Sequence, residues 1–352
     1  MSSIEFADLS IRPLTDEDYP QVDLLFQEYP HKDFQLRQLN IPKRKMAEFL
    51  KTTLADPELE SACLRQGQRL SGLISARSLP WMSEMFGARM FAIQHFLTRL
   101  DSVAYLKTML RYLLDHMTTA DFLDCRVANG DTNAIQALED NGFRFVGNEV
   151  YLARSLIESP APDEYGDNNC VSCPEQLQNQ VIDLVRNTHF HNRFMYDPEV
   201  SEHDAAEIYK QYLSGFAFKK DFRSRIVLRE GQVEGFILYR FNAAFSKAVG
   251  GNYASLDFIG VNPNNRSAGL GEELNKAALY DLAKAGATHV VVRTFGSNYP
   301  AVRICHKVGF KITSSDLHFH LWLRPKYDSR RNEKVGPSPA SGLGELERKT
   351  SL

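Results

Sequence analysis

The hydrophobic positions in the second half of the chain follow the periods of strands and helices in turn. Tyr253–Val261 is a short apolar run, which predicts a buried strand. The next segment predicts a helix closed by Gly286, because apolar residues recur there every three or four positions: Leu270, Leu274, Ala277, Ala278, Leu282 and Ala285. A further strand is predicted at His289–Thr294 and a further helix at Pro300–Val308, ended by Gly309. The pattern therefore indicates an α/β domain.

The same periodicities place elements in the rest of the chain. In the first half we expect a helix start at Thr15–Asp18, a hairpin over Ala62–Leu79, a helix with Val103, Leu106, Leu110 and Leu113 on its apolar face, and strands at Leu9–Pro13, Arg89–Leu97, Phe122–Val127 and Gly147–Arg154. In the second half we expect helices at Glu175–Asn187 and Asp204–Ser214 and a hairpin over Arg225–Phe241. Residues 156–169 have the composition of a linker. Residues 327–352 lack an apolar period and are expected to be disordered.

The loop before the helix that contains Leu274 has the composition of an anion site. Its residues are Arg266, Ser267, Ala268, Gly269, Leu270 and Gly271. Glycines at the start of a helix let backbone N–H groups approach a polyanion, and the helix dipole favours negative charge there. The loop is therefore predicted to cradle a pyrophosphate.

A second motif, Asn298–Phe310, follows the next strand and completes a resemblance. Arg266, Gly269 and Gly271 match the Arg/Gln-x-x-Gly-x-Gly/Ala loop of the GNAT superfamily of acyl-CoA N-acyltransferases. Asn298, Ala301, Gly309 and Phe310 match the superfamily's second segment. The chain thus resembles GNAT proteins over roughly Tyr253–Phe310. The resemblance implies an α/β (α+β) fold, in which a mixed twisted sheet is flanked by helices.

The first half repeats the pattern of the second. A constant separation of 167 positions relates Arg99 to Arg266, Asp131 to Asn298, Gly142 to Gly309, Arg126 to Arg293, Ala134 to Ala301 and Phe143 to Phe310. An internal duplication explains this better than chance. We therefore predict two tandem GNAT folds, over residues 1–155 and 170–326.

The two copies differ at the predicted cradle. Ser102 and Ala104 stand in the first copy where Gly269 and Gly271 stand in the second, and Asp101 lies beside them. A Cβ atom and a carboxylate both disfavour close approach of phosphates. We interpret residues 1–155 as a degenerate domain that has lost or weakened cofactor binding. Two working sites remain the alternative, because serine still offers its backbone N–H.

Composition narrows the class of protein without identifying it. The chain has 352 residues, 43% of them hydrophobic and 24% charged, which suits a globular protein of two domains. The net charge of −3 gives no bulk attraction to nucleic acid. We find no apolar run long enough for a membrane span and no signal peptide pattern, so a cytoplasmic location is expected. A homodimer is compatible with the sequence.

Metal chemistry is not expected. Cys170 and Cys173 form a lone CxxC pair, which is better explained as two small residues at a strand start. His318 and His320 alternate in a late strand, so they share one face, which we expect to be a polar strand face. No further ligand lies close to them in the sequence.

The GNAT resemblance implies how acetyl-CoA is held as a co-substrate. The pyrophosphate would lie on the amides of residues 266–271, near the charge of Arg266. The pantetheine arm would run between the splayed fourth and fifth strands, held in part by Asn298. A backbone amide near Ile259 to Val261 would bind the acetyl oxygen.

Three residues are candidates for proton transfer. Many GNAT enzymes carry a tyrosine acid seven positions after the asparagine, where this chain has Cys305. A thiol can protonate a leaving thiolate of similar pKa, but buried packing is the more common role of cysteine, and Tyr299 or water are alternatives. Asp257 is the leading candidate base, unless it lies on an outer face or in a structural ion pair. His189 is a second candidate for accepting the amine proton.

The segment Thr188–Pro198 is expected to bind the acceptor, a small-molecule amine. It is rich in aromatic and hydrogen-bonding side chains and resembles the His-x-x-Arg-Phe-x-x-Asp-Pro stretch of TDP-fucosamine-type amino-sugar N-acetyltransferases. His191, Arg193 and Tyr196 are its candidate substrate-binding residues, although a hydrophobic staple between helices would also explain the segment. Three functions follow: an amine N-acetyltransferase acting on a nucleotide-linked amino sugar, a tandem enzyme of the mycothiol-synthase architecture, and a non-catalytic acyl-CoA sensor or scaffold.

Overall fold

A computed structural model describes residues 9–56, 58–158, 170–188, 190–216, 222–265 and 269–324. His189, the loop residues Arg266, Ser267 and Ala268, most of the predicted linker and the predicted tail lie outside the described residues. The predictions made for them are therefore neither confirmed nor contradicted.

The first half begins with a strand and three helices and continues with alternating strands and helices. Its strands are β1 (Leu9–Pro13), β2 (Leu59–Gln66), β3 (Arg69–Ser78), β4 (Met90–Thr98), β5 (Phe122–Ala128) and β6 (Arg144–Ser155). Its helices are α1 (Tyr19–Glu28), α2 (Asp33–Gln38), α3 (Lys43–Thr53), α4 (Pro80–Phe86), α5 (Val103–His116) and α6 (Thr132–Glu139).

The second half repeats this order from β7 onwards. Its strands are β7 (Cys170–Ser172), β8 (Arg223–Arg229), β9 (Gln232–Phe241), β10 (Tyr253–Val261), β11 (His289–Phe295) and β12 (Lys311–Trp322). Its helices are α7 (Gln178–Arg186), α8 (Glu202–Phe216), α9 (Ala243–Val249), α10 (Leu270–Lys284) and α11 (Tyr299–Lys307). The predicted strands and helices of both copies are present with bounds shifted by a few residues. The hydrophobic pattern did not predict α2 and α3, nor the short helices α4 and α9 that precede β4 and β10.

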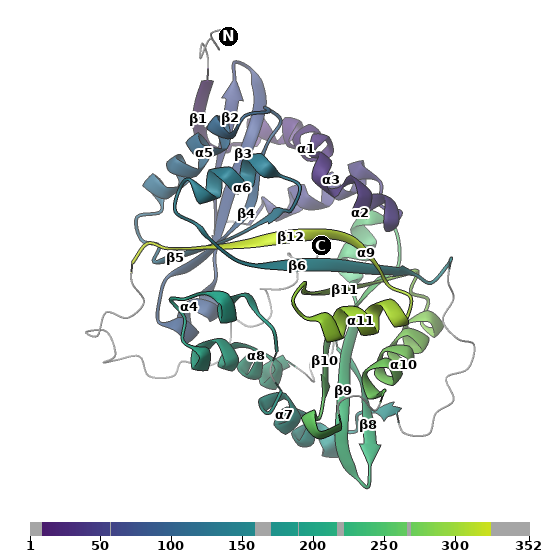
Figure 1. Cartoon of the computed structure of the whole chain (residues 1–352). Coiled ribbons are helices and arrows are strands. Elements are labelled where there is room, and N and C mark those ends of the chain that lie inside the picture. The colour runs from purple at the N-terminus through teal and green to yellow at the C-terminus, as the bar shows by residue number, and fades with distance from the viewer. Residues whose placement is uncertain are drawn as a thin grey trace.

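The two halves share one sheet, because each half gives its last strand to the other. The described strands form a 12-stranded sheet in the order β1-β2-β3-β4-β5-β12-β6-β11-β10-β9-β8-β7. β6 pairs with β11 and β12, both from the second half, and β12 pairs with β5 and β6, both from the first. Figure 1 shows β6 and β12 running side by side across the middle of the molecule, with β1–β4 on one side and β8–β10 on the other. We call β6 and β12 the exchanged strands. The separate sheets expected for the two copies are thus one continuous sheet.

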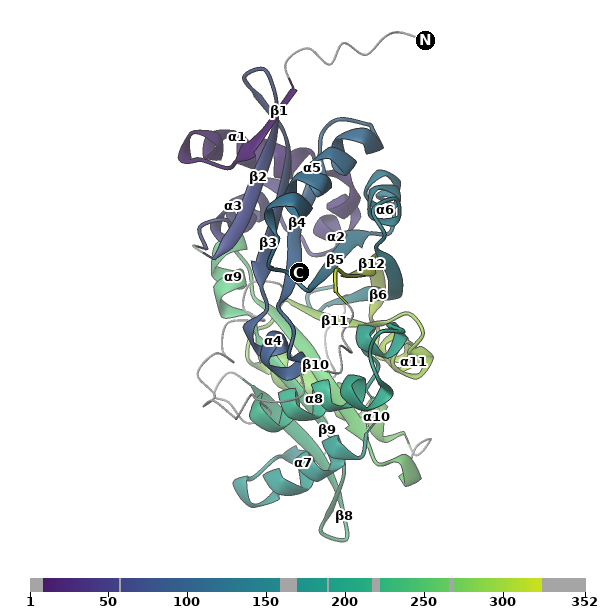
Figure 2. The same cartoon turned by 90° about the vertical axis from the view of Figure 1, so that its left-hand side faces the viewer.

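Separate hydrophobic cores lie under equivalent helices of the two halves. Leu106, Leu110 and Leu138 belong to the core that β4 and β5 form with α5 and α6. Leu274, Ala278 and Val308 belong to the corresponding core under α10 and α11. In Figure 2 the molecule is elongated, with α5 and α6 near one end and α10 nearer the other. The internal repeat is therefore also a repeat of packing.

The short helices α4 and α9 connect the halves. Phe245 and Val249 of α9 pack against Leu36, Leu39 and Ile41 of the first half. In the opposite sense, Met82 and Phe86 of α4 pack against Phe194, Ala205 and Ile208 of the second half. Each half thus buries apolar side chains of the other, in addition to exchanging a strand.

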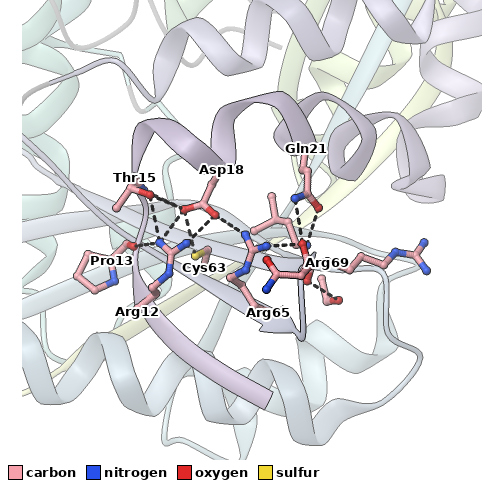
Figure 3. Close-up of polar contacts among 11 residues, drawn as sticks. Arg12, Pro13, Thr15, Asp18, Gln21, Cys63, Arg65 and Arg69 are labelled. Atoms are coloured by element: carbon pink, nitrogen blue, oxygen red, sulfur yellow. Dashed lines mark hydrogen bonds and ion pairs between the residues drawn. The ribbon is translucent and has the colours of Figure 1, made fainter. Parts of the chain in front are cut away.

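A buried carboxylate fixes α1 to the first strands, as Figure 3 shows. Asp18 is fully buried and accepts hydrogen bonds from both terminal nitrogens of Arg12, at 2.8 and 2.9 Å, while Arg65 forms a second ion pair. The backbone N–H of Thr15 donates to it at 3.0 Å. Burial acts to raise the pKa of Asp18, but the hydrogen bonds from Arg12 and Thr15 outweigh burial and lower the pKa. Asp18 therefore remains ionised in the folded protein.

None of the helices in the described ranges is long and apolar enough to cross a membrane.

Candidate active site

The strands β10 and β11 separate partway along their length. They pair in parallel from Tyr253 to Leu256 and from His289 to Val292, and the ladder ends there. Beyond this point β10 stays paired with β9 as far as Val261, and β11 stays paired with β6 as far as Phe295. The backbone groups of β10 that face β11 beyond Leu256 therefore have no ladder partner in β11. The sheet opens into a wedge at this place.

A cleft of about 690 Å³ occupies the wedge. It reaches from the first turns of α10 and α11 to residues of the acceptor segment, Phe190 and His191, and to Tyr209 of α8. Nine of the residues predicted from sequence line it: His191, Asp257, Ile259, Val261, Gly269, Leu270, Gly271, Asn298 and Cys305. The structure thus brings the described cofactor candidates and one acceptor candidate, His191, to one cavity.

Within the part of the chain that the structure describes, no side chain caps the first amides of α10. Gly269 is the N-cap residue and has φ of 80° and ψ of −3°, a left-handed conformation that favours glycine. Gly271 lies close to α11, because a Cβ atom built on it would stand 2.8 Å from Cδ1 of Ile304. Uncapped amides and the helix dipole together favour an anion at this point.

Charged side chains near the start of α10 partly offset one another. Glu272, in the first turn, lines the cleft and would repel an anion, but it forms ion pairs with Lys276 at 2.7 Å and with Lys307 at 3.4 Å. Arg303 and Lys307 of α11 also line the cleft. Two cations thus lie on the wall beside the uncapped amides.

Asp257 lies on a β-bulge that turns it to the face of the sheet opposite α10 and α11. Leu256 pairs with Tyr239 and Phe258 with Leu238, so the ladder register of β9 and β10 skips Asp257. Its carboxylate accepts from Ser255 Oγ at 3.1 Å and lies 3.3 Å from Nε of Arg240. The structure therefore combines the two interpretations of Asp257, since the side chain is in an ion pair and also lines the cleft.

Asn298 and Cys305 belong to α11. Asn298 Oδ1 accepts from the N–H of Ala301 at 3.5 Å, and its Nδ2 donates to Thr294 Oγ1 at 3.0 Å. Asn298 is thus the N-cap of α11 as well as a lining residue. Cys305 is 4% exposed, and burial raises the pKa of its thiol to about 12.

The acceptor segment divides between the rim of the cleft and the interface of the halves. His191 lines the cleft, and its Nδ1 lies 3.1 Å from the hydroxyl of Tyr196, which lies 2.8 Å from Ser297 Oγ. Tyr196 is 42% exposed, and its ring is tilted by 36° to that of Phe295, a lining residue, with 6.0 Å between ring centres. Tyr196 therefore lies at the rim rather than inside.

Arg193 requires a correction to the predicted acceptor site. It does not line the cleft, and its guanidinium pairs with Asp124 of β5 at 3.1 Å and lies over the ring of Phe194. The same interface holds Asp197, which accepts from Trp322 Nε1 at 2.9 Å and lies 2.6 Å from Nδ1 of His320. These contacts tie the segment to the exchanged strand β12, so Arg193 serves packing between the halves.

The strand face that carries His318 and His320 is polar, as their alternation predicts, but it is buried rather than exposed. His318 is 5% and His320 2% exposed, and both lie beside carboxylates of the first half. Within the described ranges, no cluster of His, Cys, Asp and Glu side chains could hold a metal ion. The two histidines belong to the contact between the halves.

Sequence reasoning missed several charged residues of the cleft, among them Glu149 and Arg293. Glu149 comes from the first half, on β6, and stands opposite Phe295 of β11. The constant spacing of 167 positions pairs Glu149 with Asp316 and could have marked it, but no local motif surrounds it. Its position in the cleft depends on the strand exchange.

The corresponding place in the first half is occupied by its own side chains. Asp131, the counterpart of Asn298, accepts from the hydroxyl of Tyr29 at 2.9 Å and from the N–H of Ala134 at 3.0 Å. Ser102, the counterpart of Gly269, caps α5 by accepting from the N–H of Ala104 at 3.4 Å. The amides at the start of α5 are thus partly satisfied within the chain.

Comparison with known proteins agrees with this geometry. Residues 181–310 match the Acetyltransferase (GNAT) family. Spore coat polysaccharide biosynthesis protein SpsD of Bacillus subtilis (strain 168) is 22% identical over 295 residues, which cover 80% of this chain and 96% of that protein. A mycothiol acetyltransferase of Saccharomonospora viridis is 31% identical over 91 residues, which cover 26% of this chain and only 30% of that protein.

Solved structures share the fold across the whole chain. A GCN5-related N-acetyltransferase from Sphaerobacter thermophilus superimposes with a TM-score of 0.59 and 14% identity, covering 90% of this chain and 96% of that one. A tandem GNAT protein from the clavulanic acid biosynthesis pathway superimposes with a TM-score of 0.52 and 15% identity, covering 89% and 98%. The expected resemblance and fold class are confirmed. Residues 181–310 thus match the acetyltransferase (GNAT) family, and the chain has the fold of tandem GNAT proteins.

Proposed function

We propose that the second half transfers an acetyl group from acetyl-CoA to the primary amine of an amino sugar. The observation that carries the proposal is the cleft itself, which joins the uncapped start of α10 to the acceptor segment through the wedge between β10 and β11. The amino sugar is supported by the relative named for spore coat polysaccharide biosynthesis, of which this chain covers almost the full length.

The residues around the wedge fit an acyl-CoA. The amides at the start of α10 and the positive charge of Arg303 and Lys307 suit the phosphates. The backbone groups of β10 near Ile259 and Val261 that have no ladder partner in β11 suit the amide-rich pantetheine arm and the acetyl oxygen. When bound, acetyl-CoA would supply the thioester whose carbonyl carbon receives the amine.

Proton transfer is assigned from the surroundings of each candidate. We assign Asp257 as the group that accepts the amine proton, because it lines the cleft on the face of the acceptor segment and is held in place by Arg240 and Ser255. Cys305 is a weak acid at a pKa of about 12. Proton transfer from Cys305 to a thiolate whose thiol has a pKa of about 8.5 is uphill by on the order of 5 kcal/mol. We therefore assign a packing role to Cys305 and propose that water protonates the leaving thiolate.

A second candidate function is acetylation of a small amino-thiol or a similar amine. It is favoured by the local similarity to mycothiol acetyltransferase over 91 residues. That match covers a minor part of both chains, whereas the polysaccharide biosynthesis relative aligns almost throughout. We therefore rank the amino sugar first.

The experiment that tests the proposal follows CoA release and amide formation over a panel of amines. The panel contains free amino sugars, nucleotide-linked amino sugars, cysteine-containing amines and polyamines, each with acetyl-CoA and the full chain. Turnover highest with an amino sugar supports the proposal, and turnover highest with an amino-thiol supports the second candidate. Tight binding of acetyl-CoA in calorimetry without turnover of any amine contradicts both and indicates an acyl-CoA sensor.

A further inference from the structure

The acceptor side of the cleft contains a carboxylate that the first half supplies. β6 alternates between the two faces of the sheet, and Val150 and Leu152 belong to the core under α10 and α11. Glu149 therefore lies on the other face, which also carries its ladder partner Phe295. Phe295 packs near Tyr196 and His318 on this face, with ring centres 6.0 and 5.6 Å apart. Glu149 thus shares its face with the acceptor segment, away from α10.

The exchanged strands hold Glu149 rigidly in a network of charges. Its Oε2 lies 3.2 Å from a terminal nitrogen of Arg126 and 3.4 Å from Nε2 of His318. Burial acts to raise the pKa of Glu149, but Arg293, His318 and Arg126 outweigh burial and hold the pKa well below its usual range. The carboxylate is therefore ionised at neutral pH, and it accepts hydrogen bonds without donating any.

Asp316, the residue that the repeat pairs with Glu149, has different surroundings. Asp316 occupies in the second copy the position that Glu149 occupies in the first, and the two residues stand opposite each other in the β6–β12 ladder. Asp316 is closed in by Lys32, whose Nζ lies 2.5 Å from Oδ1, and it is absent from the lining of the cleft. The two carboxylates share Arg126, so they differ mainly in whether they reach the cavity.

We propose that Glu149 is an acceptor-binding residue of the second half's site, which the first half supplies through the exchanged strand β6. It accepts a hydrogen bond from a donor on the acceptor, either the amino group or a hydroxyl close to it. The first half is then retained because it completes the acceptor side of the site, although its own crevice is filled. The inference rests on the proposed function and names one residue that contributes to recognition of its acceptor.

The test compares Glu149→Gln with the matched control Asp316→Asn. Both variants remove one buried negative charge from the same network, so both are expected to lower the melting temperature. Only Glu149→Gln should raise the KM for the acceptor, by about 10-fold or more, because a hydrogen bond to a charged group is worth about 1.5–3 kcal/mol. The Kd for acetyl-CoA, measured by calorimetry, should change less than about twofold in both.

Two acceptors identify the donor that Glu149 binds. With glucosamine and a cyclohexylamine that lacks hydroxyl groups, a loss confined to glucosamine assigns the contact to a hydroxyl, and an equal loss for both assigns it to the amine. Equal KM changes in the two variants, or no change in Glu149→Gln, would overturn the inference.

A binding measurement distinguishes failure of the inference from failure of the proposed function. If the wild-type chain turns over no amine, binding of glucosamine in the presence of CoA is followed by NMR, and weaker binding to Glu149→Gln than to Asp316→Asn still supports the inference. If Glu149→Gln does not fold, Glu149→Asp takes its place, because it keeps the charge but withdraws the carboxylate by one methylene group. An unchanged KM and unchanged binding in Glu149→Asp would then overturn the inference.

Discussion

The two halves have the same fold, but side chains of the first half occupy the place that corresponds to the cleft of the second. In the first half Tyr29 donates to Asp131, and Lys32 pairs with Asp316, so the segment after α1 fills the place that corresponds to the cleft. In the second half the segment after α7 remains at the rim, where Tyr196 contacts Ser297 and His191. The difference between the two crevices therefore comes as much from these segments as from the glycines of the loop.

The helix starts differ in a complementary way. Ser102 caps α5 with its own hydroxyl, whereas Gly269 leaves α10 uncapped in a left-handed conformation. The bulge on the fourth strand of each copy carries Gln94 in the first half and Asp257 in the second. The two copies thus share one framework, but the side chains of the first stabilise its own helix and strand ends, whereas those of the second suit ligand binding and catalysis. This comparison predicts which substitutions matter in each half.

The largest difference is expected at the helix starts. Gly269→Asp should weaken acetyl-CoA binding by about 10³-fold, because a side chain at positive φ is strained by about 1–3 kcal/mol and its carboxylate repels the phosphates. Ser102→Asp should leave the affinity unchanged, since aspartate is also a good N-cap. Calorimetry with both full-length variants checks the pair. Loss of binding in Ser102→Asp would show that the first half holds the cofactor.

The sealed interior of the first half should appear in the pH dependence of stability. His95 is buried between Ser75 Oγ, 2.7 Å from Nδ1, and Thr53 Oγ1, 3.2 Å from Nε2. Burial lowers the pKa of His95 to about 4. The folded pKa is lower than the unfolded value near ~6.5, so the contribution to stability is complete above about pH 6.5 and is lost as the pH falls towards 4.

This loss should amount to about 3 kcal/mol in the free energy of unfolding, since one pKa unit corresponds to ~1.4 kcal/mol. Urea titrations at several pH values between 7 and 4 measure it. His95→Asn should have a lower free energy of unfolding than the wild type at pH 7. Between pH 7 and pH 4 its free energy of unfolding should fall by about 3 kcal/mol less than that of the wild type. His116→Gln, at an exposed position on α5, is the control and should keep the wild-type profile. An unaltered pH profile in His95→Asn would contradict the assignment.

The N-caps of α6 and α11 should separate stability from activity. Asp131→Ala removes a cap and leaves the hydroxyl of Tyr29 without its acceptor, so it should cost about 2–3 kcal/mol of stability with little change in kcat/KM. Asn298→Ala should cost only about 1 kcal/mol but should lower kcat/KM by about 10-fold, because Asn298 lines the cleft. Denaturant titrations and steady-state kinetics on both variants check this. The opposite distribution of effects would place the functional site in the first half.

Much of this comparison follows from the sequence, because it depends on local patterns. The periodicity places the helix containing Leu274 and the strand His289–Thr294 close to their observed bounds, and the glycine loop lies at the start of α10. The cleft then gathers Asp257, Asn298 and Cys305 as expected. Local signals suffice here because each residue is fixed by its own strand or helix end.

The strand exchange could not be predicted in the same way. β6 and β12 have equal lengths and equivalent positions in the repeat, so their patterns fit pairing within a half as well as pairing across halves. The choice depends on tertiary packing, such as the contacts of α4 with Phe194 and of α9 with Leu39. For the same reason the sequence placed Arg193 in the acceptor site, where its ion pair with Asp124 of the other half was not foreseeable.

The smallest effect is expected at Cys305, the residue in the place of the usual tyrosine acid. Cys305→Ala and Cys305→Ser should each change kcat by less than about threefold, because a thiol with a pKa of about 12 cannot protonate the leaving thiolate efficiently. Its counterpart Leu138 is a core residue of the first half, in which packing is the role we assign to this position. Cys305→Leu should therefore fold, while its larger side chain narrows the cleft and raises the KM for acetyl-CoA. Single-turnover rates separate these effects, and a drop of 10²-fold or more in Cys305→Ala would restore Cys305 as the acid.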